Sequence, residues 1–496
     1  MNGIECRQSF ADSMAYWFPL NRRSLILLSA IELLFVWISA ANVGRGTYEY
    51  DEADYMYAAS KGYIANYTDS PTMPFMEFLR LGLAARNPEQ RAHVADTVRQ
   101  DDDVLYYRHW HGPTYYLALI PVAGLGLDEA ATRRSMLFIP ALTIAFVYIG
   151  VAWLVPGEEG ETAAFLASIL FAFSSTMFRS SELAPHKLFA LFCLTSLFAL
   201  SKALVTGQAR YLCVAVALAC FACSTLEGAF VLLFPIVLCG VWERKRLGLD
   251  RTSAFRLSAL ALCALVVAWP GSVLRLSLPK SYFFMAYLFF LRRGHDAFEE
   301  ITLTETWANR ILTSPVEWLV IVAAISIYIL SRDARTRLRP FLPLLVYGFA
   351  AIFIIVRITT VRLRYSFVFQ PALDVFAAIA IASSLSRLRA VTRNSVTVVV
   401  AVALVAGMLY QVHLGPPASD RRSYELVTYL RQKQWGGRLL LVNWSDVPVI
   451  HYYFPRFRLR SYRGADPTPS EISGSGAEIV LLTGYPIRSI KIGSSD

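Results

Sequence analysis

Repeated apolar runs, each about long enough to cross a lipid bilayer, constrain this chain more than any other feature. A helical crossing needs about 17–25 predominantly apolar residues, and the first such run covers 25–43. Over 496 residues, 55% are hydrophobic and only 17% are charged, with a mean hydropathy of +0.44. These values exclude a soluble enzyme of this size. The sequence therefore predicts an all-α polytopic membrane protein.

The net charge of +10 has two interpretations, a nucleic-acid partner or an oriented membrane protein. The Lys and Arg residues occur in short clusters between apolar runs, where they orient helices and contact anionic lipid. Membrane lipids are therefore expected partners, and nucleic acid is not.

The apolar runs predict about eleven spans by the same length rule. They are expected at 24–43, 135–155, 162–178, 187–204, 211–226, 228–242, 254–270, 315–331, 341–358, 366–386 and 396–413.

The basic clusters test this order, because Lys and Arg favour the cytoplasmic side. The clusters at 22–23, 244–246, 332–339 and 387–393 all fall on that side if residues 44–134 lie outside without crossing. The apolar piece 114–125 is then a short interfacial helix. An alternative count treats that piece as a true span, which would place the basic clusters on alternating sides.

One loop, 156–161, is cytoplasmic in this scheme although it holds three Glu and no Lys or Arg. The rule tolerates this because acidic residues contribute little to orientation. The first apolar run lacks a small-residue cleavage site, so it is predicted to be a retained helix rather than a signal peptide.

Four domains are predicted: 1–43, an N-terminal tail with the first helix; 44–134, an extracytoplasmic loop; 135–414, the transmembrane core; and 415–496, a small extracytoplasmic α/β domain. The last is expected to contain a helix at 421–433, strands at 438–443, 457–462 and 478–483, and a short helix at 447–454. It is interpreted either as a lid or acceptor-docking element, or as a domain that only caps the membrane core.

An acidic cluster follows the first span, where Asp51, Glu52 and Asp54 stand close together. Mutual repulsion and partial desolvation are expected to raise the pKa of at least one of them, which would suit a general base. On a helix, Asp51 and Asp54 share a face while Glu52 points elsewhere. The alternatives are a solvated acidic loop, or a helix N-terminus that favours carboxylates.

Two histidines, His109 and His111, end the outer loop. They could bind a metal or orient a phosphate. The alternative is that they anchor the loop at the interface by hydrogen bonds.

These segments resemble landmarks of the glycosyltransferase C superfamily. The acidic pair Asp51-Glu52 after the first helix and the segment 111–116 (HGPTYY) resemble its Asp-Glu and His-Pro-Pro-Leu-Tyr-Tyr segments. Further matches are Arg133-Arg134, the segment 181–186 (SELAPH) and the segment 362–365 (RLRY). The most similar branch contains bacterial protein O-mannosyltransferase-like and aminoarabinose-transferase-like enzymes.

The resemblance implies a fold with about 11–13 transmembrane helices and a metal-independent enzyme in the inner (plasma) membrane. Such an enzyme takes a sugar from a polyprenyl phosphate and transfers it, on the extracytoplasmic face, to a hydroxyl of a lipid, glycan or protein. It further implies a single inverting displacement in which Asp51 is the base, Glu52 is its neighbour in the acceptor site, and no cofactor takes part.

Cations at the outer face would meet the charge of the departing phosphate. Arg133 and Arg364 match family positions for this contact. The full set of candidate substrate-binding residues is Asp54, His109, His111, Arg133, Glu182, His186, Lys187, Arg362, Arg364 and Tyr365.

A transporter or flippase of a lipid-linked glycan is the alternative function, since about a dozen spans suit it as well. Transporters of that size usually show two similar halves and ionisable residues at mid-membrane. Here the halves differ and the charges lie at helix ends, which favours the transferase. A silent scaffold has no feature that supports it.

Overall fold

The computed structural model describes residues 21–43, 46–60, 75–84, 90, 112–179, 183–269, 314–358, 363–414, 421–433, 435–462, 466–482 and 487–492. Contacts divide the chain into two units. Unit 1 comprises 1–42, 136–270 and 293–416, and unit 2 comprises 43–135, 271–292 and 417–496. The extracytoplasmic loop and the C-terminal domain of the sequence prediction thus share one unit.

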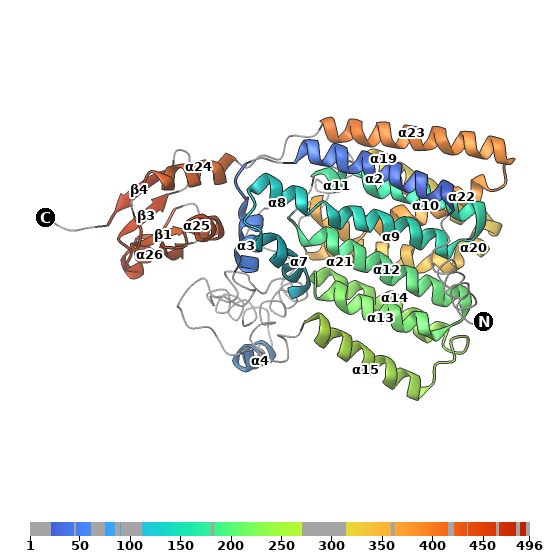
Figure 1. Ribbon diagram of the computed structural model, residues 1–496. Helices are drawn as coiled ribbons and strands as arrows, with labels where there is room; N and C mark the ends of the chain where they lie inside the picture. Colours follow the sequence, from blue (N-terminus) through green and yellow to red (C-terminus); the bar gives the residue numbers. More distant parts are fainter. Residues whose placement is uncertain are drawn as a thin grey trace, which may run out of the picture. The chain divides into compact units, whose positions relative to one another are not determined.

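Unit 1 is a bundle of long helices (Figure 1). Its described helices are α2 (Arg22–Asn42), α9 (Phe138–Leu154), α10 (Gly157–Phe173), α11 (Ser175–Arg179), α12 (Pro185–Thr206), α13 (Ala209–Cys223), η1 (Glu227–Leu232), α14 (Leu233–Trp242), α15 (Arg251–Ala268), α19 (Pro315–Leu330), α20 (Arg332–Leu338), η2 (Arg339–Phe341), α21 (Leu342–Ile358), η3 (Leu363–Val368), α22 (Gln370–Leu385) and α23 (Ala390–Leu414).

Each of the eleven predicted spans coincides with a helix of this bundle. In the described ranges, 7 helical stretches are long and apolar enough to cross a membrane, and four shorter apolar helices accompany them. The protein is therefore an integral membrane protein with an all-α core. The ends differ from prediction by a few residues; α10, for example, begins at Gly157 rather than 162, because Glu158 and Glu159 occupy its first turn, where carboxylates are favoured.

Small side chains allow the central helices to approach closely. Helix α10 packs against α2, α9, α22 and α23, while α12 packs against α9 and α13. A Cβ on Gly150 of α9 would collide with the ring of Phe198 on α12, and one on Gly348 of α21 would collide with Leu373 on α22. Small residues have this role in membrane helices, because lipid offers no hydrophobic drive for helix association.

The acidic first turn of α10 lies at the same end of the bundle as the basic clusters. Glu158 pairs with Arg393, and Glu159 lies 4.0 Å from a guanidinium nitrogen of Arg337. The Glu158 side chain is exposed, and a solvated ion pair contributes little stability. The two contacts nevertheless show which chain segments meet. They explain how the loop 156–161 can share a side with the Arg clusters.

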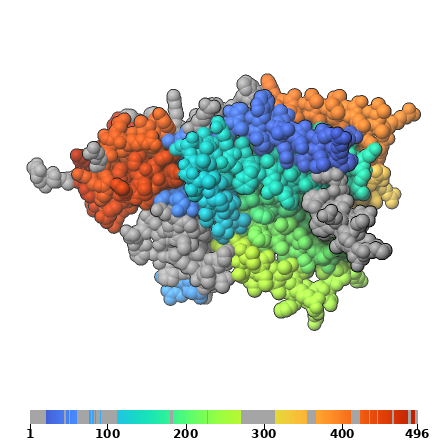
Figure 2. All heavy atoms as spheres, in the orientation of Figure 1, coloured from blue at the N-terminus to red at the C-terminus, as the bar shows by residue number. Residues whose placement is uncertain are grey.

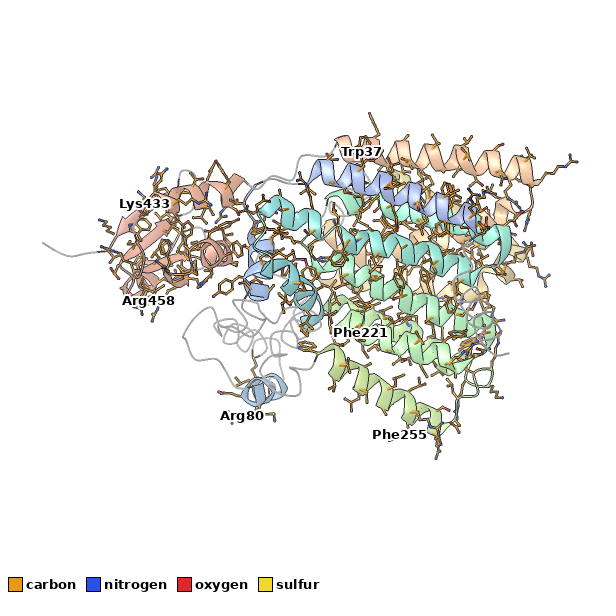
Figure 3. The ribbon with its side chains drawn as sticks, viewed as in Figure 1. Trp37, Arg80, Phe221, Phe255, Lys433 and Arg458 are labelled. Carbon is orange, nitrogen blue, oxygen red and sulfur yellow. The ribbon has the colours of Figure 1, made fainter. Side chains whose placement is uncertain are left out.

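The outside of the bundle is apolar, as a lipid-facing surface requires. Helices α2 and α23 lie on the face of unit 1 that Figure 2 shows. Trp37 of α2 and Phe255 of α15 are 71% and 75% exposed and lie on the outside of the bundle (Figure 3).

The described elements of unit 2 combine short helices with one sheet. The helices are α3 (Tyr50–Ser60), α4 (Phe75–Ala84), α7 (Pro113–Gly124), α8 (Glu129–Ser135), α24 (Arg421–Arg431), η4 (Trp444–Asp446), α25 (Val447–Tyr453) and α26 (Pro469–Ser475). The strands are β1 (Leu439–Asn443), β2 (Arg458–Tyr462), β3 (Ile479–Leu482) and β4 (Arg488–Lys491). Helix α7 is the apolar piece that was expected to be short, and it has 12 residues.

The sheet has the strand order β2-β1-β3-β4, with β1 parallel to both β2 and β3 and β4 antiparallel to β3. Leu441 of β1 and Val480 of β3 are paired in register and belong to one small core with Tyr462. The predicted α/β domain is thus present. Helix α26 and strand β4 were not predicted, because the sequence of α26, PSEISGS, has the composition of a turn and β4 has only 4 residues.

Candidate active site

Helix α3 carries the acidic motif, and a side chain of that motif starts the helix. Glu52, at the third helical position, accepts a 3.2 Å hydrogen bond from the backbone N–H of Glu49. This is the reciprocal half of a capping box, in which a Glu satisfies the N–H of the residue before the helix. The acidic residues Asp51 and Glu52 both lie in the first turn, so the alternative of a helix N-terminus that favours carboxylates also agrees with the structure.

The three carboxylates have different environments. Asp51 is half-buried, while Glu52 and Asp54 are each only 4% exposed. The predicted rise in the pKa of one of them stays a prediction.

Glu52 forms a buried, bidentate ion pair with Arg133 of α8. Arg133 Nη2 lies 2.6 Å from Glu52 Oε2, and Nε lies 3.1 Å from Oε1. The same guanidinium donates to the carbonyl oxygens of Gly46 at 2.9 Å and Thr47 at 3.0 Å. It also lies 5.3 Å from the centre of the Tyr48 ring. These contacts anchor the start of α3 to α8.

Arg133 was predicted to contact the donor phosphate, and that role stays a prediction. Its contacts with Glu52, Gly46 and Thr47 favour a role in positioning α3. The Glu52 carboxylate is likewise occupied, because it pairs with Arg133 and accepts from the backbone N–H of Glu49. Asp51 is therefore the more accessible carboxylate of the first turn.

The second sequence motif packs directly on α3. Helices α3 and α7 are in contact, and the ring of Tyr55 lies 5.4 Å from that of Tyr115 and 5.9 Å from that of Tyr116, both nearly edge-on. Tyr115 and Tyr116 are fully buried. The structure thus brings the acidic segment into contact with the end of the outer loop. The two are about sixty positions apart in the chain and belong to the same unit.

Three residues that were not predicted as site residues also hold the start of α3, namely Glu129, Tyr48 and Tyr453. Tyr453 belongs to α25, which packs on α3; its hydroxyl accepts a 2.8 Å hydrogen bond from the backbone N–H of Tyr48 and donates one of 2.7 Å to Glu129. Glu129 and Arg133 are one helical turn apart, a spacing that places both on one face of α8. That spacing was the only available signal, because the contact with Tyr453 spans more than 300 positions.

In unit 1, two candidate substrate-binding residues begin α12. His186 and Lys187 follow Pro185 at the first helical position and are 2% and 3% exposed. Proline suits this position because its ring presets the helical φ and its missing N–H would have had no partner within the helix. Helix α12 contacts η3, which carries the backbone of Arg364 and Tyr365, so these two motifs come from neighbouring elements.

Several candidates lie outside the described residues or have side chains that are not described. His109, His111, Glu182 and Arg362 belong to the first group. Arg364 and Tyr365 belong to the second. Within the described ranges, no group of three or more His, Cys, Asp or Glu side chains is placed to hold a metal ion.

No protein-family model and no curated protein matches the sequence. Solved structures do match. An archaeal oligosaccharyltransferase from Archaeoglobus fulgidus in the apo form aligns with a TM-score of 0.56 and 14% identity, over 88% of this chain and 64% of that chain. The same organism's AglB, in complex with an inhibitory peptide and a dolichol-phosphate, gives a TM-score of 0.57 and 13% identity, over 93% of this chain and 69% of that chain.

A third match is ArnT from Cupriavidus metallidurans bound to undecaprenyl phosphate, with a TM-score of 0.51 and 14% identity, over 89% of this chain and 86% of that chain. The chain therefore shares the fold of these solved membrane proteins. At these identities the similarity concerns the fold, and activity has to be argued from the site.

Proposed function

We propose that the protein is a membrane glycosyltransferase that moves a sugar from a polyprenyl-phosphate donor to a hydroxyl of an extracytoplasmic lipid, glycan or protein. The observation that carries the proposal is the anchored first turn of α3. Arg133 and Glu52 fix this turn, and it presents Asp51 as its half-buried carboxylate. The glycosyltransferase C fold supports it, and so do two of the similar structures, which contain a dolichol-phosphate and undecaprenyl phosphate.

In the proposed reaction, the acceptor oxygen attacks the anomeric carbon while Asp51 takes the hydroxyl proton. The bond between that carbon and the phosphate oxygen breaks, and the lipid phosphate leaves with the electron pair. A single displacement of this kind inverts the anomeric configuration. Lys187, Arg362 and Arg364 are the cations proposed to meet the charge that develops on the leaving phosphate.

The first prediction tests the base. Asp51→Asn keeps the size of the side chain but removes its basicity, so transfer is expected to fall by about 10²–10⁴-fold while the protein still folds and binds donor. The assay incubates purified protein with radiolabelled polyprenyl-phosphate sugars and a membrane extract, and follows which label moves. Glu77→Gln, an exposed change on α4 of the same unit, is the matched control.

Two results would contradict the proposal. One is an Asp51→Asn variant that transfers sugar as fast as the wild type. The other is movement of intact donor across a proteoliposome membrane with no transfer of label, which the alternative function, a lipid-linked glycan transporter, predicts.

A further inference from the structure

Each of the four residues before α3 (46–49) is held by a hydrogen bond to one of its backbone atoms. The carbonyls of Gly46 and Thr47 accept from Arg133, and the N–H of Tyr48 donates to the Tyr453 hydroxyl. The N–H of Glu49 donates to Glu52. Because Asp51 follows within two residues, these hydrogen bonds hold the backbone from which its carboxylate projects.

Tyr453 is the contribution of the C-terminal segment to this arrangement. Its hydroxyl links two groups, since it accepts from Tyr48 N at 2.8 Å and donates to Glu129 Oε1 at 2.7 Å. The neighbouring Tyr452 packs edge-on against the Tyr48 ring, with ring centres 5.1 Å apart. Helix α25 thus contacts the start of α3 through both a hydrogen-bond relay and ring packing.

The phenol of Tyr453 is suited to this relay at neutral pH. Burial raises the pKa of Tyr453 well above its ordinary value, and the adjacent Glu129 carboxylate raises it further. The hydroxyl therefore keeps its proton and can donate to Glu129 while its lone pairs accept from Tyr48. A phenylalanine would fill the same space and make neither bond.

We infer that Tyr453 is a positioning residue for the proposed transfer, and that the C-terminal domain is needed for turnover because α25 fixes the backbone just before Asp51. This inference rests on the proposed function and assigns the domain a role beyond that of a cap. Misplacement of a reacting group by about 1 Å can cost about 10²-fold in rate. Loss of the relay should therefore reduce kcat more than it alters donor binding.

The test compares two Tyr→Phe variants of full-length protein. Tyr453→Phe removes the relay, and Tyr429→Phe removes a hydrogen bond of 2.8 Å to Ser489 elsewhere in the same domain. We expect Tyr453→Phe to lower kcat by about tenfold or more with donor KM within about twofold, and Tyr429→Phe to leave both within about twofold. The two variants are expected to have similar melting temperatures, so the difference in kcat cannot come from stability.

Glu129 supplies a second, independent pair of variants. Glu129→Gln keeps an oxygen that can accept from Tyr453, so it should retain most activity, whereas Glu129→Ala should resemble Tyr453→Phe. Because both residues act through one relay, the double variant Tyr453→Phe/Glu129→Ala should be no slower than the worse single variant.

The inference is wrong if Tyr453→Phe matches Tyr429→Phe in kcat, or if Glu129→Gln is as slow as Glu129→Ala. It is also wrong if the loss of activity merely follows a fall in melting temperature. The proposed function fails separately, through a fully active Asp51→Asn variant or through movement of intact donor without transfer of label.

Discussion

The buried ion pair between Arg133 and Glu52 determines local structure more than it adds stability. Both side chains are 5% exposed, and their closest atoms are 2.6 Å apart. A buried ion pair of this kind adds little net stability, yet removal of one partner leaves an uncompensated charge. The pair therefore specifies where α3 begins.

Removal of one partner is expected to destabilise the protein strongly. Arg133→Met should lower the free energy of unfolding by about 3–5 kcal/mol, which thermal unfolding in detergent can detect. Arg134→Gln is the control, because Arg134 is the exposed neighbour on the same helix. Equal melting temperatures for the two variants would contradict the positioning role of Arg133, whereas a selective rise in donor KM at unchanged stability would favour the predicted phosphate contact.

At the scale of elements, the contact between α25 and α3 is built from tyrosines. Burial is the main cause that raises the pKa values of Tyr48, Tyr452 and Tyr453. A phenol with a raised pKa in the folded state holds its proton more tightly than it does in the unfolded chain. Its contribution to stability is complete below the unfolded value, near pH 10, and is lost as the pH rises toward the folded value.

We therefore expect the stability of unit 2 to fall once the pH exceeds about 10, and these three phenols to ionise after the exposed tyrosines. Phenolate absorbance during an alkaline titration measures the order of ionisation, and circular dichroism measures unfolding. In Tyr453→Phe, stability should fall less steeply with rising pH, because one phenol with a raised pKa is absent. If all tyrosines titrate together before any unfolding, this packing does not exist in solution.

At the scale of the whole molecule, the ion pairs at one end of unit 1 give the bundle a polarity. Glu158, Glu159 and the Arg clusters that pair with them lie at that end. By the positive-inside rule this end is predicted to be cytoplasmic, and segments 44–134 and 415–496 to be extracytoplasmic.

Single cysteines in a background without the seven native ones test this prediction. Thr336 of α20 and Ser473 of α26 are both exposed. A membrane-impermeant maleimide should label Ser473→Cys in intact cells or spheroplasts, and Thr336→Cys only after the membrane is opened. Labelling of Thr336→Cys alone would reverse the orientation and remove Asp51 from the proposed face.

The sequence by itself determined the membrane class, the eleven helices and most of the C-terminal α/β elements. The physical reason is that these depend on local properties: the length of apolar runs needed in a bilayer and the alternation of buried and exposed residues in short strands. It also identified the acidic segment and the segment 111–116 as the unusual parts of the outer loop.

Only the tertiary structure decided which contacts hold the acidic segment in place. The resemblance implied a place for Glu52 in the acceptor site, which stays a prediction, but its partner Arg133 lies 81 positions away. The relay through Tyr453 joins segments 405 positions apart and ends on the backbone N–H of Tyr48. A backbone group carries no side-chain signature, and the pairing of distant segments depends on the packing of α3, α8 and α25, so no local pattern could have revealed it.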